Sequence, residues 1–333
     1  MAENINRRGF IQSGSTLAFA SLLPAELLAS IEDIPVGPFG FATTADEVAE
    51  GIDLTGKTVL ITGCNSGLGY ESMKTIAAHG GHVIGTARTM EKAVNACDSV
   101  EGNTTPLVCE LTDFDSVVAC ADSVQAMDTP LDVLMCNAGI MALPELEQVN
   151  GIEKQFVVNH LGHFILTTRL LPQVEAAPEG RIVMVSSIGY RNAPKAGIEF
   201  DNLSWNRGYK PFTAYGQTKL ANALFAFELA RIYEGTSVSA NAIHPGLVAT
   251  NLGRYFSSKP RDPNAPLRKG MKTADQGAST QVYVAIHPSL TGVSGYYFED
   301  CNPVVPSGTH MSDETLAAQL WAVSQALTAP YLS

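Results

Sequence analysis

From residue 57 onward, short apolar runs alternate with longer stretches in which apolar residues recur at helical spacing. Such runs predict buried strands, and the stretches between them predict amphipathic helices. The predicted strands are residues 59–61, 82–85, 106–109, 133–136, 182–185, 239–243 and 295–298. Because strands that alternate with helices build parallel sheets, we predict an α/β fold: one doubly wound parallel sheet with helices on both faces.

Two segments, residues 189–211 and 251–272, interrupt this alternation. A last helix is predicted over residues 313–327, and residues 304–333 form a C-terminal extension beyond the last predicted strand. The apolar stripe of that helix is typical of core packing. It consists of Leu316, Leu320, Val323 and Leu327.

Residues 1–30 differ in character from the rest of the chain. Arg7 and Arg8 are followed by Phe10 and by a modest apolar run at residues 15–23, a pattern typical of bacterial twin-arginine export signals. It predicts a protein of the bacterial periplasm. No clean cleavage site follows, so the alternative is an amphipathic or disordered arm on a cytoplasmic protein. Residues 31–54 are predicted to be an extended lead-in, with a short helix that starts in a capping-box pattern at residues 43–48.

Composition narrows the class of protein. The formal net charge is −12 and no basic stripe occurs, which argues against a nucleic-acid surface. No apolar run reaches about 18 residues, so no membrane span is predicted. The cysteines show neither a CxxC pair nor zinc-ligand spacing, so we expect no disulfide framework and no metal site. They are Cys64, Cys97, Cys109, Cys120, Cys136 and Cys301.

A glycine-rich motif follows the first predicted strand: residues 62–69 read TGCNSGLG and precede a predicted helix over residues 70–78. A strand, a glycine turn and a helix form a dinucleotide-binding unit, because the helix start offers free N–H groups to a pyrophosphate. Gly63 is assigned to the tight turn, Gly67 to the approach of the pyrophosphate, and Gly69 to close packing of helix on strand. For this motif alone, an ordinary glycine turn is the alternative. The other loop residues assigned to the cofactor are Asn65, Ser66 and Leu68.

The end of the second predicted strand distinguishes the two nicotinamide cofactors. In NAD-binding units of this type, an acidic residue about 20 residues beyond the glycines binds the ribose hydroxyls. Residues 84–90 contain no acid, and Arg88 stands there instead. An arginine can pair with the 2′-phosphate of NADP, whereas an acid would repel it, so we predict NADP and consider NAD less favoured. The alternative is that Arg88 is a solvated surface charge.

Further cofactor contacts are predicted where the third, fourth and sixth strands end. Glu110 could accept a hydrogen bond from the adenine amino group. Pro245 and Gly246 turn the chain after the sixth strand, which places Val248 and Thr250 for the nicotinamide carboxamide. The residues after the third and fourth strands could instead be turn residues chosen for their backbone conformation. The other residues assigned to these strand ends are Leu111, Asn137, Ala138 and Gly139.

Tyr215 and Lys219 open a long helical stretch that runs to residue 232. Because positions i and i+4 share one helix face, the phenol and the ammonium can act together. A neighbouring cation stabilises phenolate, so it lowers the phenol pKa from about 10 toward neutral pH, where proton transfer is most efficient. The lysine can also hold the ribose hydroxyls of a cofactor. A YxxxK pair alone is common by chance, so its interpretation depends on the other motifs.

The predicted strand at residues 182–185 ends in Ser186 and Ser187, and a serine there can hold the substrate oxygen while the tyrosine moves the proton. Asn159 is the candidate fourth member, since its amide can anchor a water between the lysine and solvent. Alternatively, Asn159 bonds its own backbone at a helix bend. His160 and His163 lie three residues apart without a third ligand, so we assign them to packing rather than to a metal.

The motifs TGxxxGxG, NAG, VNHLGHF, VSS, YxxxK and HPG occur in this order. Together they resemble the short-chain dehydrogenase/reductase family over residues 55–303, a Rossmann-like NAD(P)-binding domain. The branch is similar to retinol dehydrogenases, WW-domain oxidoreductase and light-dependent protochlorophyllide reductase. The resemblance implies hydride transfer between NADP(H) and a carbonyl or alcohol group of a small hydrophobic substrate. It selects the second serine, so the implied catalytic set is Ser187, Tyr215, Lys219 and Asn159.

Two features of the sequence depart from the family pattern, and other functions are considered as alternatives. Glu110 stands where an aspartate is usual, and an export segment is unusual. The glycine spacing and the short tail argue against one alternative, a sugar-nucleotide epimerase or dehydratase. The complete catalytic set argues against another, a redox sensor that binds NADP without turnover. A homo-oligomer is left as an option. Residues 251–272 are expected to form a mobile lid in which Leu252, Tyr255 and Phe256 face the substrate.

Overall fold

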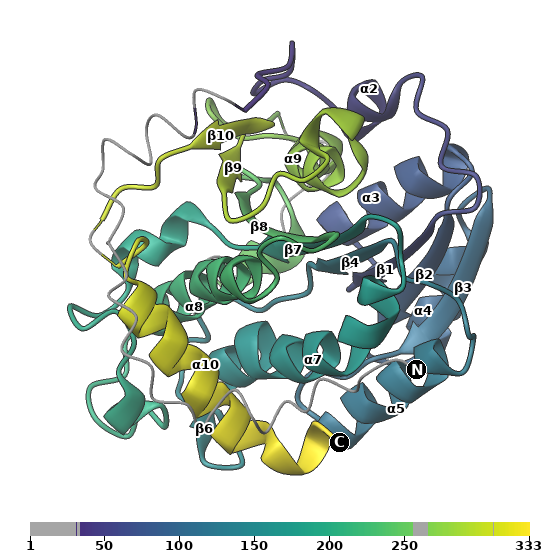
Figure 1. Cartoon of the computed structure of the whole chain (residues 1–333). Helices are drawn as coiled ribbons and strands as arrows, with labels where there is room; N and C mark the ends of the chain where they lie inside the picture. The colour runs from purple at the N-terminus through teal and green to yellow at the C-terminus, as the bar shows by residue number, and fades with distance from the viewer. Residues whose placement is uncertain (1–30, 32–33, 256–265, 309) are drawn as a thin grey trace.

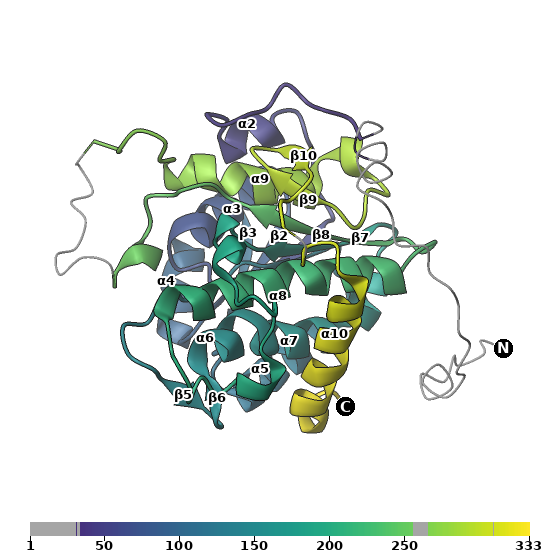
Figure 2. The same cartoon turned by 90° about the vertical axis from the view of Figure 1, so that its left-hand side faces the viewer.

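The computed structural model describes residues 31, 34–255, 266–308 and 310–333. The segment assigned to twin-arginine export lies outside the described residues. The core of the fold is an eight-stranded sheet with helices on both faces (Figures 1 and 2). This arrangement confirms the predicted α/β class.

The strands of the sheet lie in the order β10-β9-β8-β7-β4-β1-β2-β3. All neighbouring strands are parallel except β9 and β10. The chain runs from β1 outward to β3, then returns to the other side of β1 through β4, which makes the β1–β4 boundary a switch point where ligands of such sheets bind. The strands are β1 Thr58–Thr62, β2 His82–Ala87, β3 Asn103–Val108, β4 Val133–Cys136, β7 Gly180–Val185, β8 Val238–His244, β9 Tyr297–Glu299 and β10 Asn302–Val304.

Two hydrophobic cores lie on opposite faces of the sheet (Figure 1). One is shared by α2, α3, α4 and α9, the other by α5, α7, α8 and α10. The helices are α2 Ala45–Ala49, α3 Gly67–Ala78, α4 Met90–Asp98, α5 Phe114–Gln125, α6 Lys154–Phe156, α7 Gly162–Glu175, α8 Pro211–Ile232, α9 Ala274–Ile286 and α10 Glu314–Thr328. A π-helical turn, η2 Val157–Leu161, joins α6 to α7.

Each of the predicted strands is present in the sheet, and the short helix in the lead-in has the predicted capping box between Thr44 and Glu47. The sequence analysis missed the antiparallel strand β10 and the small hairpin of β5 Gln148–Val149 with β6 Ile152–Glu153. These strands are too short for an alternating pattern, and β10 contains Pro303, which is tolerated because β10 is an edge strand.

The C-terminal helix α10 packs across α7 and α8, so the extension is part of the domain core (Figure 1). The Trp321 ring lies 5.2 Å from Phe164 and 5.7 Å from Phe225, measured between centroids. Leu316 and Leu320 are buried as predicted, whereas Leu327 is 38% exposed.

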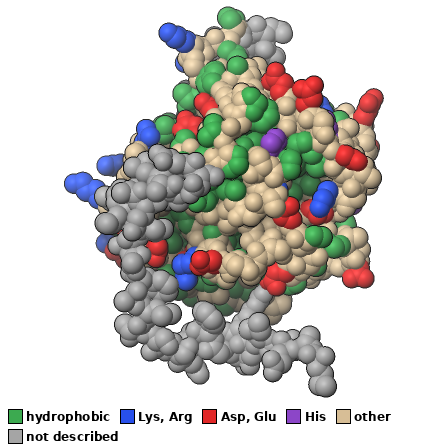
Figure 3. All heavy atoms as spheres, turned by 45° about the horizontal axis from the view of Figure 1, so that its top comes forward, with side chains coloured by type: hydrophobic (Ala, Val, Ile, Leu, Met, Phe, Trp, Pro, Cys, Tyr) green, Lys and Arg blue, Asp and Glu red, His purple; other side chains and the backbone are tan. Residues whose placement is uncertain are grey.

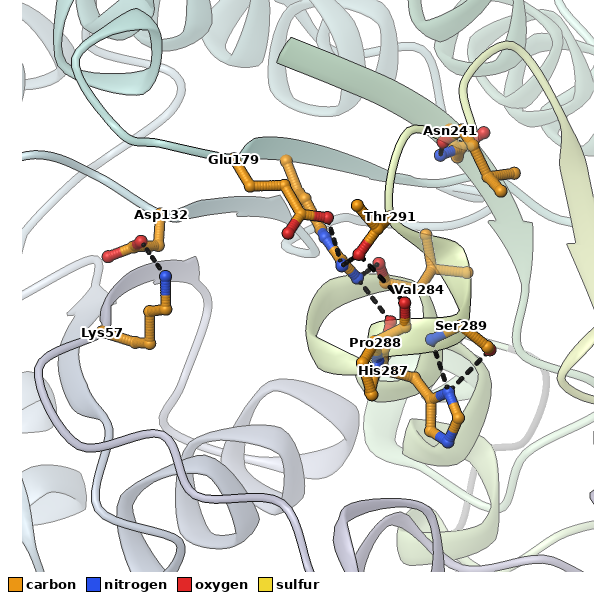
Figure 4. A network of polar contacts seen from close by, with 11 residues as sticks. Lys57, Asp132, Glu179, Asn241, Val284, His287, Pro288, Ser289 and Thr291 are labelled. Atoms are coloured by element: carbon orange, nitrogen blue, oxygen red, sulfur yellow. Dashed lines mark hydrogen bonds and ion pairs between the residues drawn. The ribbon is translucent and has the colours of Figure 1, made fainter. Parts of the chain in front are cut away.

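The amino ends of the strands are tied together by polar contacts (Figure 4). Lys57 pairs with Asp132 at 2.9 Å across β1 and β4. Arg181, at the start of β7, pairs with Glu179 at 2.6 Å and donates to the carbonyl of His287 at 2.9 Å. These contacts hold the amino ends of the strands together. The predicted site residues lie at the opposite, carboxyl ends.

In the part of the chain that the structure describes, no helix is long and apolar enough to cross a membrane. On the face that Figure 3 shows, acidic and basic side chains are scattered among hydrophobic and neutral ones. They do not gather into a basic patch where the described atoms are visible, in keeping with the net charge of −12.

Candidate active site

The glycine-rich loop has the shape of a dinucleotide cradle. Gly63 and Gly67 adopt φ angles of +75° and +62°, which L side chains rarely adopt. A Cβ at Gly69 would lie 2.4 Å from the carbonyl oxygen of Gly63, so only glycine lets α3 pack this closely on the loop. Ser66, the N-cap of α3, makes no capping bond with its side chain, which leaves the first N–H groups of the helix available to a pyrophosphate. The loop therefore fits the cofactor predicted for it.

The loop after β4 is held against β1 by Thr62. The Thr62 hydroxyl accepts the N–H groups of Asn137 and Ala138, both at 2.9 Å, and the Asn137 amide donates to the Thr62 carbonyl at 2.8 Å. A Cβ on Gly139 would lie 3.7 Å from the Lys219 Nζ, so the loop passes directly beside Lys219. The role of Thr62 could not be predicted from the sequence, because its partners are about 75 residues away in the chain.

Asn159 is hydrogen-bonded to this loop. Its Oδ1 accepts from Ile140 N at 2.9 Å, and its Nδ2 donates to Ile140 O and Thr218 Oγ1, both at 2.9 Å. Both amide hydrogens are used in these bonds, and Oδ1 keeps one acceptor position, so the water relay stays a prediction. The amide connects the β4 loop to α8, the helix that carries Tyr215.

His163 extends the same network. Its Nε2 lies 2.8 Å from the Thr62 hydroxyl and its Nδ1 lies 3.1 Å from the Asn159 carbonyl. Because the Thr62 oxygen already accepts two backbone N–H groups, we infer that the Thr62 hydroxyl donates to Nε2. The ring proton then lies on Nδ1 and is donated to the Asn159 carbonyl. Burial lowers the pKa of His163 to about 4. His160 is also buried: its ring packs against Phe156 and Phe225, and its Nε2 lies 2.7 Å from the Ser324 Oγ.

The two serines at the end of β7 have different partners. The Ser186 hydroxyl donates to the Lys219 carbonyl at 2.6 Å and is buried. The Ser187 hydroxyl accepts from Gly189 N at 3.0 Å, and it lies close enough to the Tyr215 phenol to lower the tyrosine pKa. A Cβ on Gly189 would lie 2.8 Å from the Tyr215 ring, so this glycine lets the serine turn approach the phenol. Ser187 is therefore the serine placed to share a substrate oxygen with Tyr215.

Tyr215 and Lys219 lie together on α8, as their spacing predicts, and the Lys219 Nζ is 5.7 Å from the tyrosine ring centroid. Burial raises the pKa of the Tyr215 phenol to about 12, and the Ser187 hydroxyl opposes this rise. Burial lowers the pKa of Lys219 to about 8, and its Nζ donates to Val185 O at 2.8 Å. Burial therefore sets the direction of the Tyr215 pKa shift, and the lowering expected from the lysine is not found in this structure.

The segment after β8 lies beside the glycine loop. Gly246 adopts a φ of +90°, as a turn at this point requires. A Cβ on Gly67 would lie 3.3 Å from the Thr250 methyl group, which brings the two predicted cofactor segments into contact range. Val248 forms a parallel bridge with Lys272, a residue that the sequence analysis did not single out. Pro245, Gly246, Val248 and Thr250 thus follow the carboxyl end of β8, where the nicotinamide was expected.

Arg88 is exposed directly after β2. A cavity of about 350 Å³ lies between the glycine loop and α4. It is lined by Asn65, Tyr70, Lys92, Asn95, Ala96 and Ser99. Lys92 adds a second positive charge near the end of β2. It was not predicted from the sequence, because it lies on α4 and not at the strand end itself.

The residues after β3 are engaged locally. The Glu110 Oε1 accepts from the Thr112 N–H at 3.1 Å and from the Thr112 hydroxyl at 2.9 Å, which favours the turn alternative for Glu110. Leu111 is buried against Gly162. In the lid segment, Leu252 is half-buried and Tyr255 is 42% exposed, while Phe256 lies outside the described residues.

Comparisons with known proteins agree with this arrangement. The family model described as short chain dehydrogenase matches residues 57–199, a stretch that ends before Tyr215. A short-chain dehydrogenase of Brassica napus, TIC 32 B, is 38% identical, with 86% of this chain and 93% of that protein covered. The chain belongs to the short-chain dehydrogenase family. The resemblance inferred from the motifs is confirmed.

Other relatives name related activities. Human retinol dehydrogenase 14 is 38% identical, with 82% of this chain and 86% of the relative covered. Human WW domain-containing oxidoreductase is 36% identical, with 92% of this chain and 77% of the relative covered. As a family member, the chain is an NAD(P)-dependent oxidoreductase that acts on alcohol or carbonyl groups of small molecules.

Solved structures support the fold. An uncharacterised protein from Mycobacterium paratuberculosis superposes with a TM-score of 0.67 at 33% identity, covering 85% of this chain and 97% of that one. A protein from Beutenbergia cavernae, described as an NAD(P)-dependent gluconate 5-dehydrogenase with bound NADP, superposes with a TM-score of 0.57 at 23% identity, covering 74% and 95%. The second likeness shows the fold alone.

Proposed function

We propose that this oxidoreductase uses NADP(H) and acts on a carbonyl or alcohol group of a small hydrophobic substrate. The observation that carries the cofactor choice is the pair of basic residues beside the glycine loop. Arg88 follows β2, Lys92 lines the cavity next to Asn65, and no acid lies between residues 84 and 90. Two cations there favour a 2′-phosphate over two ribose hydroxyls.

The proposed mechanism assigns one task to each catalytic side chain. When bound, the nicotinamide supplies or accepts the hydride. Ser187 donates a hydrogen bond to the substrate oxygen, and Tyr215 gives that oxygen a proton in reduction or removes one in oxidation. Because burial raises the phenol pKa to about 12, Tyr215 keeps its proton at neutral pH, which suits the acid role in carbonyl reduction. Lys219 is placed to grip the ribose and to stabilise phenolate as it forms.

Exposed apolar side chains near the site support a hydrophobic substrate. Leu247 is 62% exposed, and Tyr255 and Leu267 are also exposed. Large apolar side chains that gather in an exposed segment often mark a binding surface. A small cavity of about 60 Å³ is lined by Ile188, Arg191, His244 and Glu299 among others, so its lining combines apolar and charged side chains.

The cofactor proposal is tested by dissociation constants for NADPH and NADH on the wild type and on Arg88→Ala. A charge-assisted hydrogen bond is worth roughly 1.5–3 kcal/mol, or about ten- to a hundredfold in affinity. Arg88→Ala should weaken NADPH binding by that factor and leave NADH binding nearly unchanged, with a smaller effect in high salt. Equal wild-type affinity for the two cofactors would refute the NADP assignment, and tighter NADH binding would reverse it.

We also propose export to the bacterial periplasm through the twin-arginine route. This proposal rests on the sequence of residues 1–30 alone, with Arg7, Arg8 and the apolar run that follows them. The route moves folded proteins, so a cofactor acquired in the cytoplasm could travel with the enzyme.

A further inference from the structure

Lys272 is a fully buried lysine directly before α9, with 0% of its side chain exposed. Its Nζ lies 2.5 Å from the Asp300 Oδ1, an ion pair without hydrogen-bond geometry, and 5.3 Å from the centroid of the Phe41 ring. Burying an ammonium group is unfavourable unless it is paired, and a hydrophobic side chain of similar volume would often be more stable. A buried lysine at this point therefore suggests a task beyond filling space.

Both the backbone and the stem of Lys272 hold the segment after β8. Its N–H donates to Leu247 O at 2.8 Å, and its carbonyl accepts from Ala249 N at 3.0 Å. A Cβ on Gly246 would lie 3.0 Å from the Lys272 Cδ, so the aliphatic stem lies directly against this glycine. Leu247 is largely exposed, and burial of its own side chain therefore contributes little to holding the segment.

The partner of Lys272 lies in a strained turn. Asp300 and Cys301 form the two-residue loop between β9 and β10, with φ angles of +51° and +61°. Such loops favour Asn-Gly, because other residues are strained in the left-handed region. The side chains explain why this turn departs from that preference. Asp300 reaches Lys272, and Cys301 is buried with its N–H donating to Thr280 Oγ1 at 3.1 Å.

We propose that the Lys272–Asp300 pair is a positioning device for residues 246–250. The β9–β10 turn fixes the Asp300 carboxylate, the carboxylate fixes the Lys272 ammonium, and the lysine fixes the segment that receives the nicotinamide. Lys272 is thus a positioning residue that acts through Gly246, Leu247 and Ala249. The inference rests on the proposed function, because it assumes that this segment binds the nicotinamide half of the cofactor.

The test compares two ligands on the same variants. NADPH occupies the whole site, whereas adenosine 2′,5′-bisphosphate contains the adenosine and its phosphates without the nicotinamide. Lys272→Met keeps the length of the side chain and removes its charge. The variant should weaken NADPH binding roughly tenfold, because binding would then also have to order residues 246–250. It should change binding of the bisphosphate by less than about twofold. Lys269→Met, an exposed lysine in the same segment, is the matched control and should change neither constant.

Asp300 variants separate positioning from a plain structural role. Asparagine tolerates the left-handed region, so Asp300→Asn should keep the turn and reproduce the NADPH defect of Lys272→Met. Asp300→Gly relieves the turn strain but removes the carboxylate, so it should also weaken NADPH binding even if the melting temperature rises. If Lys272→Met does not fold, these two variants carry the test.

The outcomes distinguish the inference from the function on which it rests. Equal weakening of NADPH and the bisphosphate would mean that the pair only stabilises the fold, and unchanged NADPH binding in all three variants would mean that the pair does not position the segment. Either result overturns the inference and leaves the proposed function intact. A wild type that binds neither NADPH nor NADH would overturn both.

Discussion

Thr62→Val offers a direct test of how the fold supports the site. Valine has the shape of threonine, so the change removes one hydroxyl at a buried position on β1. It leaves the N–H groups of Asn137 and Ala138 and the Nε2 of His163 without their partner. Each orphaned polar group costs about 1–3 kcal/mol when buried, and the two N–H groups are only half-buried, so the total loss should be about 2–4 kcal/mol.

Thr86→Val is a closely matched control. Thr86 lies beside Thr62 on the neighbouring strand β2 and is as deeply buried. Its hydroxyl has no hydrogen-bond partner among the described residues. Removing it should therefore leave the free energy of unfolding unchanged or raise it slightly, although the chemical change is identical.

The two variants are compared by calorimetry and by activity. At about 2 °C per kcal/mol in a domain of this size, Thr62→Val should melt roughly 4–8 °C below the wild type. Its kcat should also fall, because the released loop runs beside Lys219. Equal melting temperatures for Thr62→Val and Thr86→Val would show that the hydroxyl does not hold the loop, and the described network would be wrong.

Three further predictions concern catalysis, pH and export. Tyr215→Phe removes the phenolic proton and keeps the ring, so activity should fall by about 10²–10⁴-fold while NADPH still binds; a folded variant with near-normal turnover would refute the assignment. Burial lowers the pKa of His160 to about 3 and of His163 to about 4, so below pH 6.5 the unfolded chain takes up protons that the folded protein refuses. Stability should therefore be fully present above pH 6.5 and fall with decreasing pH, by about 2 kcal/mol per histidine near pH 5, and a flat unfolding free energy between pH 7 and pH 5 would contradict this. Replacing Arg7 and Arg8 with lysine should retain the protein in the cytoplasm of a bacterial host; a wild type found wholly in the cytoplasm of its native cell would favour the arm alternative.

The sequence by itself determined the elements whose signals are local. Apolar runs and helical spacing depend on neighbouring residues, so they predicted the strands of the sheet and the helix over residues 313–327. Glycine spacing predicted the cradle because only glycine permits the close approach at Gly69. The i, i+4 rule placed Tyr215 and Lys219 on one helix face, because helical spacing also depends only on residues close together in the chain.

Only the tertiary structure decided what depends on contacts between distant segments. Periodicity does not say which polar groups become partners, so the bonds by which the Asn159 amide joins the β4 loop to α8 could not be predicted. Burial reversed the direction expected for the Tyr215 pKa, because desolvation of the phenolate depends on the whole surrounding fold. The ion pair of Lys272 with Asp300 has no local signal at all, since an interaction between residues far apart in the chain exists only once the sheet has brought β9 beside β8.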